Sequence, residues 1–199
     1  LGDFYEMFFD DALTVSRELD LTLTGRAGGN KEKVPMCGVP FHSADTYIER
    51  LVHKGYKVAI CEQIEDPKLA KGLVKRKIIK VITPGTITLE NAVASKQNNY
   101  NGCLTASDGI ISMALMDVTT GECLWADCAA SEMGDVLFDI LAVYEPSELI
   151  YDKMGDYMKT VQHYLKGHLS QCTVTAFAVD DSVDYKEQAK SYFEAEAFA

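Results

Sequence analysis

The succession of strand-like and helix-like segments after residue 100 places the strongest constraint on how this chain can fold. Two turn signals, Ser107-Asp108-Gly109 and Thr119-Thr120-Gly121-Glu122, separate three stretches that have strand character. Beyond them the pattern of apolar and helix-ending residues predicts helix, strand, helix and strand in turn. Strands are expected over residues 101–106, 110–118, 123–127, 148–151 and 172–179, and helices over residues 131–144 and 155–165. A three-stranded meander followed by alternating helices and strands predicts an α/β unit.

The chain up to residue 86 has a different order of predicted elements. Apolar side chains at helical spacing predict a helix over residues 6–20. Two prolines and a glycine exclude a regular helix over residues 34–40, and we expect a loop there. Ser43 is a suitable N-cap for a second helix, which Gly55 ends. The remaining expectations are a short strand over residues 21–23, a loop over 25–33, strands over 57–64 and 74–83, and a turn over 83–86.

The net charge is unevenly distributed along the chain. Residues 1–92 contain 13 Lys and Arg against 13 Asp and Glu, whereas the rest contains 6 against 17, which accounts for the whole net charge of −11. Such an asymmetry indicates two units with different partners. We therefore expect a mixed-sheet α/β domain over residues 1–90 and a second α/β domain over residues 91–199, with a linker over residues 87–99. The acidic second unit should avoid phosphate backbones, whereas the neutral first unit can approach them.

The composition disfavours several classes of protein. No apolar run approaches the roughly 20 residues that cross a bilayer, and no signal peptide opens the chain. The six cysteines lack C-x-x-C spacing, and the histidines lack the i, i+4 spacing of a helical metal site. We therefore expect no metal site, no membrane segment, and buried, reduced thiols in a cytoplasmic protein. Because the chain begins with Leu1 rather than Met, we expect a piece of a longer protein, truncated at both ends.

Phe4 and Glu6 form a Phe-x-Glu triplet near the start of the chain. Residues two apart share a face only where the backbone is extended, and Tyr5 would then point the other way. An extended Phe4 can enter a minor groove and open a base step, which costs less where pairing is already poor. Glu6 would repel phosphates except where a displaced base edge offers a hydrogen bond. The alternative is a core phenylalanine beside an ordinary surface carboxylate, since the isolated triplet is common.

Seven stretches of the chain match, in order, the sequence pattern of one protein family. They are residues 2–8 (GDFYEMF), 35–42 (PMCGVPFH), 58–64 (VAICEQI), 81–86 (VITPGT), 98–100 (NNY), 116–122 (MDVTTGE) and 146–151 (PSELIY). The chain resembles the MutS family of DNA mismatch-recognition proteins, strongly over its first half. The resemblance implies a mismatch-recognition domain followed by most of a connector domain, which is a ribonuclease H-like α/β fold. It also implies that Phe4 inserts beside a mispaired base and that Glu6 forms a hydrogen bond with it.

Other residues become candidate DNA contacts in the light of this resemblance. Arg26 resembles a family position near the DNA backbone, and the alternative is a solvated loop charge. Basic residues of the strand over 74–83 can contact phosphates or can simply alternate on an exposed strand. The predicted loop over residues 35–42 can line the groove beside Phe4 or can be a rigid turn without a ligand. The additional candidates are Tyr5, Met36, Val39, Pro40, His42, Lys75, Arg76 and Lys77, with Lys80 completing the basic cluster.

The resemblance implies partners as well. No G-x-x-x-x-G-K-[ST] motif occurs, so the ATP and Mg²⁺ expected of the full-length protein would bind outside this chain, which we expect to have no cofactor and no enzymatic activity. The family closes around mismatched double-stranded DNA as a dimer, and its connector contacts the repair factor MutL. For this chain the resemblance therefore implies a homodimeric, cytoplasmic, nucleoid-associated bacterial parent protein.

Two other functions are open from the sequence. A ribonuclease H-like unit can be a two-metal nuclease, and the candidate ligands are Asp108, Asp117, Asp139 and Asp152. Only Asp117 lies at a predicted strand end, where such ligands are placed. The acidic second unit can also be a protein-interaction module without DNA binding of its own.

Overall fold

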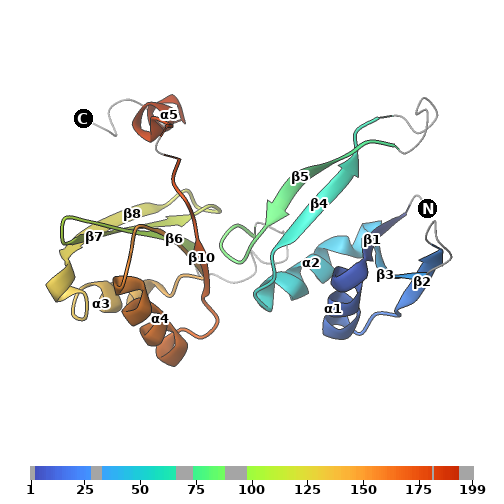
Figure 1. The fold of residues 1–199 in the computed structure, drawn as a ribbon, viewed down its shortest axis with the longest axis horizontal. Helices are drawn as coiled ribbons and strands as arrows, with labels where there is room; N and C mark the ends of the chain where they lie inside the picture. The colour runs from blue at the N-terminus through green and yellow to red at the C-terminus, as the bar shows by residue number, and fades with distance from the viewer. Residues whose placement is uncertain (1–2, 28–32, 66–73, 88–97, 181, 193–199) are drawn as a thin grey trace.

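The computed structural model describes residues 3–27, 33–65, 74–87, 98–180 and 182–192. Figure 1 shows two groups of elements along the chain, each with its own sheet or sheets. We call the described residues up to 87 the first unit and those from 98 onward the second unit. Each contains a separate cluster of buried apolar side chains.

The first unit is built on a three-stranded antiparallel sheet with the order β1-β3-β2. Its strands are β1 (Phe4–Phe8), β2 (Thr24–Ala27) and β3 (Lys33–Pro40). The helices are α1 (Phe9–Leu19) and α2 (Ala44–His53), which follows the short 3-10 helix η1 (Phe41–Ser43). Strands β4 (Val58–Gln63) and β5 (Arg76–Ile82) form a two-stranded antiparallel ribbon that extends away from the helices (Figure 1). The core comprises Val39, Ala44, Ile48, Val52, Ile82 and Ile87.

Three expectations for the first unit were wrong. The helix expected from residue 6 begins at Phe9, because residues 4–8 pair with β3 instead. The strand expected over residues 21–23 is irregular. Strand β2 begins at Thr24, one residue before the expected loop, and continues into it, and residues 28–32 of that loop lie outside the described ranges. The expected loop over residues 35–42 is strand β3 followed by η1. Prolines are tolerated there because Pro35 precedes the stretch that pairs with β1 and Pro40 ends it.

The second unit confirms the predicted order of elements. Strands β6 (Tyr100–Ser107), β7 (Ile110–Asp117) and β8 (Cys123–Ala129) form an antiparallel meander, and β9 (Glu148–Asp152) and β10 (Thr173–Ala176) add parallel strands beyond β6. The sheet order is β10-β9-β6-β7-β8. Helices α3 (Leu137–Tyr144) and α4 (Tyr157–His168) lie on one face of this sheet, as Figure 1 shows. Helix α5 (Tyr185–Tyr192) follows β10.

Two details of the second unit differ from the sequence expectation. The helix expected from residue 131 begins at Leu137, because the 3-10 helix η3 (Ala130–Glu132) and turns occupy the preceding residues. Strand β10 ends at Ala176 rather than at residue 179. The hairpin signal is confirmed, since Asp108 and Gly109 both have positive φ between β6 and β7. Most of the linker expected over residues 87–99 lies outside the described ranges.

None of the six cysteines, all of which lie in the described ranges, forms a disulfide, but only some of them are buried as expected. Cys37 and Cys128 are buried and Cys172 is partly buried, whereas Cys61, Cys103 and Cys123 are exposed. The exposed thiols belong to strands β4, β6 and β8. Among the described residues, no helix is long and apolar enough to cross a bilayer.

Candidate nucleic-acid interface

One face of the β1-β3-β2 sheet gathers most of the strongest candidates. Phe4 and Glu6 are in extended backbone on β1, which is the condition under which the two side chains share a face, and they pair with Pro40 and Gly38 of β3. Arg26 belongs to β2 on the other edge of β3. Side chains of paired residues and of residues two apart project to the same side of a sheet. Phe4, Glu6, Arg26, Met36 and Pro40 therefore share one face, which we call the reading face.

Phe4 is the exposed aromatic side chain of the reading face. It is 55% exposed, which excludes the alternative that Phe4 is a core residue. Gly38 lies beside the ring, since a Cβ at Gly38 would be 3.5 Å from Phe4 Cδ1. The absence of a side chain at Gly38 leaves room for the ring to lie against the strand and project outward. Phe4 is therefore an exposed aromatic ring on extended backbone.

Glu6 and Arg26 meet on the reading face. Arg26 Nη1 donates to Glu6 Oε2 at 3.0 Å, and the side chains are 26% exposed for Glu6 and 63% exposed for Arg26. An ion pair this exposed contributes little to folding stability. It does compensate part of the carboxylate charge on a surface that would otherwise repel phosphate groups.

Tyr5 and Val39 lie on the opposite, core-facing side of the sheet. Val39 is 4% exposed and belongs to the hydrophobic core, and the Tyr5 phenol donates a hydrogen bond to Glu62 Oε1 of β4. This bond, followed by burial, raises the pKa of Tyr5 to about 12, because both favour the neutral phenol. As candidate DNA contacts, the side chains of Tyr5 and Val39 are therefore corrected to supporting residues behind the reading face.

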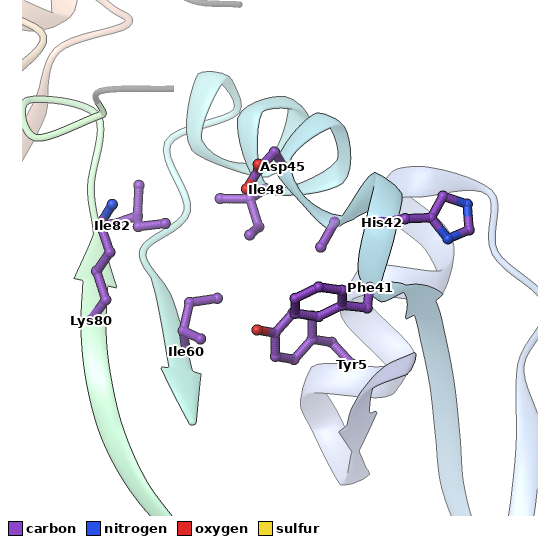
Figure 2. A pocket seen from close by; sticks show the side chains of 9 residues that line it. Tyr5, Phe41, His42, Asp45, Ile48, Ile60, Lys80 and Ile82 are labelled. Carbon is purple, nitrogen blue, oxygen red and sulfur yellow. The ribbon is translucent and has the colours of Figure 1, made fainter. Parts of the chain in front are cut away.

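A cleft of about 310 Å³ lies on this core-facing side. Figure 2 shows the Tyr5 and Phe41 rings beside each other, with the centroids 5.6 Å apart, and Ile60 of β4 across from them. The ring of His42 points away from Tyr5 in the same view. Phe4 and Glu6 do not line this cleft, so it is distinct from the reading face.

The basic cluster belongs to a different sheet. Lys75 precedes β5, while Arg76, Lys77 and Lys80 lie on it, and all four are exposed. Strand β5 pairs only with β4 among the described strands, so these charges are not continuous with the β1-β3-β2 sheet. Their exposure agrees with either alternative, phosphate contact or alternating surface charge.

The carboxylates proposed as nuclease ligands occupy ordinary structural positions. Asp108 lies in the β6–β7 turn, Asp139 on α3 and Asp152 at the end of β9. Asp117 is fully buried, and it accepts hydrogen bonds from the backbone of Asn99 and from both the backbone and hydroxyl of Thr119. Burial favours the neutral acid, but these hydrogen bonds outweigh it and lower the pKa of Asp117. Within the described ranges, no three His, Cys, Asp or Glu side chains are grouped to hold a metal ion.

Three residues near the reading face were not singled out from the sequence. Glu62 anchors Tyr5, Gly38 lies under Phe4, and Phe41 packs against Tyr5. All three lie within stretches that carried the resemblance, at residues 35–42 and 58–64. The signal for them was therefore present, but their roles depend on contacts between strands that the sequence does not specify.

The sequence of this chain is similar to one family of known proteins. The family model described as MutS domain I matches residues 1–91. The chain is 48% identical over 177 residues to the DNA mismatch repair protein MutS of Alkaliphilus oremlandii, and the alignment covers 86% of the chain and 20% of that protein. It is 47% identical over 190 residues to the protein of the same name from Brevibacillus brevis, and this alignment covers 96% of the chain and 21% of that protein.

A third relative, the DNA mismatch repair protein MutS of Acetivibrio thermocellus, is 53% identical over 150 residues, which cover 75% of the chain and 17% of that protein. The chain thus spans about a fifth of the length of the curated relatives it matches. These matches extend past the family model into the second unit. The chain therefore belongs to the MutS family of DNA mismatch repair proteins, and it contains MutS domain I over residues 1–91.

Proposed function

We propose that the reading face recognises mispaired or unpaired bases in duplex DNA, with Phe4 as the wedge and Glu6 as the hydrogen-bonding partner of the displaced base. The observation that carries the proposal is the exposure of Phe4 on a strand that presents Glu6 on the same face. The names of the relatives, which are mismatch repair proteins, agree with this role.

The physical basis is the cost of deforming DNA. Inserting an apolar wedge unstacks a base step and kinks the duplex, and this costs less where pairing is already disrupted. Phe4 supplies the ring for stacking. Glu6 adds selectivity, because its carboxylate is disfavoured near phosphates unless a displaced base donates a hydrogen bond to it.

The remaining candidates would then act around this centre. Arg26, Met36 and Pro40 share the reading face, and His42 is exposed in η1 just beyond β3. Lys75, Arg76 and Lys77 on the separate ribbon would contact the phosphate backbone at a distance from the mismatch.

We further propose that residues 1–90 are the mismatch-recognition domain and residues 91–199 a MutS connector domain. The sheet of the second unit, an antiparallel meander extended by two parallel strands, supports a ribonuclease H-like fold. Its acidic composition favours a protein partner over DNA, and a MutL-type repair factor is the proposed one. In the full-length protein, homodimerisation and the binding of ATP and Mg²⁺ would involve residues outside this chain. We propose that the full-length protein acts in the cytoplasm, on the nucleoid.

The test compares two duplexes that differ by one G·T mispair. The full-length protein, intact and with Phe4→Ala, is titrated by fluorescence anisotropy at one salt concentration, with Phe177→Ala as the control. Phe177 is 50% exposed, much like Phe4, but it follows β10 in the second unit. We expect Phe4→Ala to lose roughly 1–3 kcal/mol of preference for the mispair. Equal discrimination by Phe4→Ala and the intact protein would refute the wedge.

A further inference from the structure

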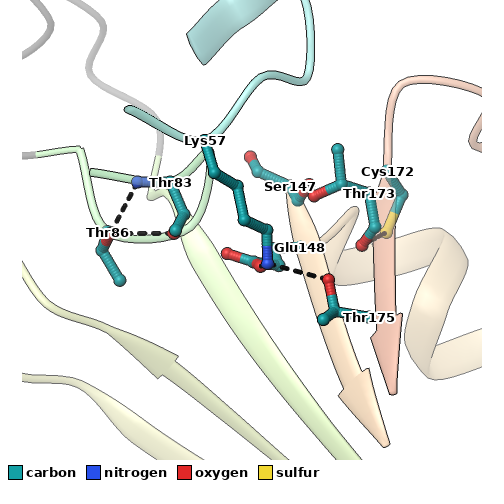
Figure 3. Close-up of polar contacts among 8 residues, drawn as sticks. All are labelled: Lys57, Thr83, Thr86, Ser147, Glu148, Cys172, Thr173 and Thr175. Atoms are coloured by element: carbon teal, nitrogen blue, oxygen red, sulfur yellow. Dashed lines mark hydrogen bonds and ion pairs between the residues drawn. The ribbon is translucent and has the colours of Figure 1, made fainter. Parts of the chain in front are cut away.

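Glu148 is a buried carboxylate of the second unit, and the cation that pairs with it belongs to the first unit. It begins β9 and is 2% exposed. Lys57, which immediately precedes β4 of the first unit, places its Nζ 2.6 Å from Glu148 Oε1. The same Nζ donates to Thr175 Oγ1 of β10 at 2.8 Å. Figure 3 shows the Lys57 side chain reaching across to both residues.

The free-energy cost of breaking this ion pair depends on which of its two charges is removed. A buried carboxylate that loses its cation stays desolvated and uncompensated, which is strongly destabilising, whereas removing both charges is far less so. Because Lys57 is itself 38% exposed, it regains water when it leaves, and the penalty falls on Glu148. The contact therefore favours the docked arrangement of the two units.

A second set of contacts lies beside the ion pair. Asn99 Nδ2 donates to the carbonyl oxygen of Pro84 at 2.9 Å, and Ser147 Oγ donates to Asn99 Oδ1 at 2.6 Å. A Cβ added at Gly85 would be only 2.8 Å from Asn101 Cβ, so the turn over residues 83–86 lies directly against β6. This turn follows β5, whose Ile82 pairs with Val58 at the start of β4. The base of the β4–β5 ribbon is thus held against the second unit at two points.

The other end of β4 holds the strand that carries the reading face. Glu62 of β4 accepts the hydrogen bond of Tyr5, which lies between Phe4 and Glu6. Strand β4 therefore makes two contacts. Near its end it contacts the back of β1, and at its start it contacts the buried carboxylate of the second unit.

We propose that β4 is a positioning strand: Lys57 fixes it on the second unit through Glu148, and Glu62 holds the reading strand β1 through Tyr5. Lys57, Glu62 and Glu148 are positioning residues rather than DNA contacts. The docking part of this inference stands on the contacts alone, and its consequence for mismatch reading rests on the proposed function.

Docking is tested without DNA by hydrogen–deuterium exchange on the full-length protein. Lys57→Met should speed amide exchange about tenfold over residues 83–86, 147–149 and 173–175, because the contacts between the units open. Lys57→Arg keeps the charge and should restore protection. Lys57→Met combined with Glu148→Gln should exchange more slowly than Lys57→Met alone, since the uncompensated carboxylate is gone. The control is Lys54→Met, which breaks the exposed ion pair with Glu18 inside the first unit.

The consequence for reading is tested on the same variants with the matched and G·T duplexes. Lys57→Met should reduce the mismatch preference about threefold to tenfold, Lys57→Arg should restore it, and Lys54→Met should keep it. Unchanged exchange in Lys57→Met overturns the docking role of Lys57. Faster exchange with an unchanged preference overturns the positioning role of β4. An intact protein without any mismatch preference refutes the proposed function, while the exchange data still decide whether Lys57 and Glu148 dock the units.

Discussion

Arg26 and Glu6 form an ion pair of 3.0 Å across strand β3, although 20 residues separate them in the sequence. The carboxylate proposed to approach a mispaired base is therefore held beside a cation on its own sheet. In the proposed complex with DNA, phosphates would lie near both groups, so the two side chains would act together on affinity and selectivity.

Replacing Glu6 by Gln is expected to strengthen binding to matched DNA and to weaken discrimination. The neutral amide no longer repels phosphates and leaves Arg26 free to attract them. We expect the affinity for the matched duplex to rise by about 1 kcal/mol, with a smaller gain on the mispaired duplex, because the amide can still form a hydrogen bond with the base. Anisotropy titrations of both duplexes measure the two changes.

The matched control for Glu6 is Glu18→Gln, which removes one negative charge from α1, where Glu18 pairs with Lys54. If Glu18→Gln raises the affinity for matched DNA as much as Glu6→Gln does, the effect reflects net charge and not the reading face.

Gly38→Ala is expected to displace the wedge without unfolding the protein. The new Cβ would be 3.1 Å from the carbonyl oxygen of Tyr5 and 3.5 Å from Phe4 Cδ1, so β1 must shift by a few tenths of an ångström. We expect a stability loss of about 1 kcal/mol and a several-fold loss of mismatch preference. Urea unfolding and anisotropy report the two effects. Gly134→Ala, where a Cβ meets nothing within 4 Å, should change neither.

Tyr5→Phe removes the hydrogen bond to Glu62 and is expected to destabilise the protein by about 1 kcal/mol near neutral pH. The sign of the pH dependence follows from the raised pKa. The folded protein favours the neutral phenol, so the contribution of Tyr5 is complete below its ordinary pKa of 10.0 and is lost as the pH rises through about 12. Measuring the free energy of unfolding of the intact protein and of Tyr5→Phe across this pH range tests the prediction. A stability difference that widens with rising pH would contradict the assigned hydrogen bond.

Asp117→Asn tests whether this carboxylate is structural. It is buried, and Asn cannot accept the same set of donated hydrogen bonds, so we expect a loss of about 1–3 kcal/mol at neutral pH. Because the pKa of Asp117 is lowered in the folded protein, its contribution is present above the ordinary value of 3.8 and is lost as the pH falls through the folded value. The two proteins should therefore converge in stability in acid.

Urea unfolding at several pH values measures this difference, with Asp108→Asn as the control. Asp108 lies in the exposed β6–β7 turn with φ of 51°, a conformation that Asn also adopts readily. A normal stability of Asp117→Asn would leave Asp117 available for another role.

The sequence by itself determined the features that depend on short-range pattern. Residues two apart share a face wherever the backbone is extended, and β1 meets this condition, so Phe4 and Glu6 lie on one face and Tyr5 on the other. Turn signals at Asp108-Gly109 fixed the β6–β7 hairpin. These features were predictable because a strand of period two and a tight turn are specified by residues a few positions apart.

The tertiary structure alone decided which distant segments meet. It turned the proline-containing segment from Lys33 to Pro40 into the central strand of the reading face, and it buried Val39 behind that face. It also paired Arg26 with Glu6, Tyr5 with Glu62 and Lys57 with Glu148. None of these pairs lies within one turn or one strand. The pairs within the first unit form because burying apolar side chains in its core sets the register and contacts of strands that are far apart in the sequence, whereas Lys57 and Glu148 meet where the two units are in contact.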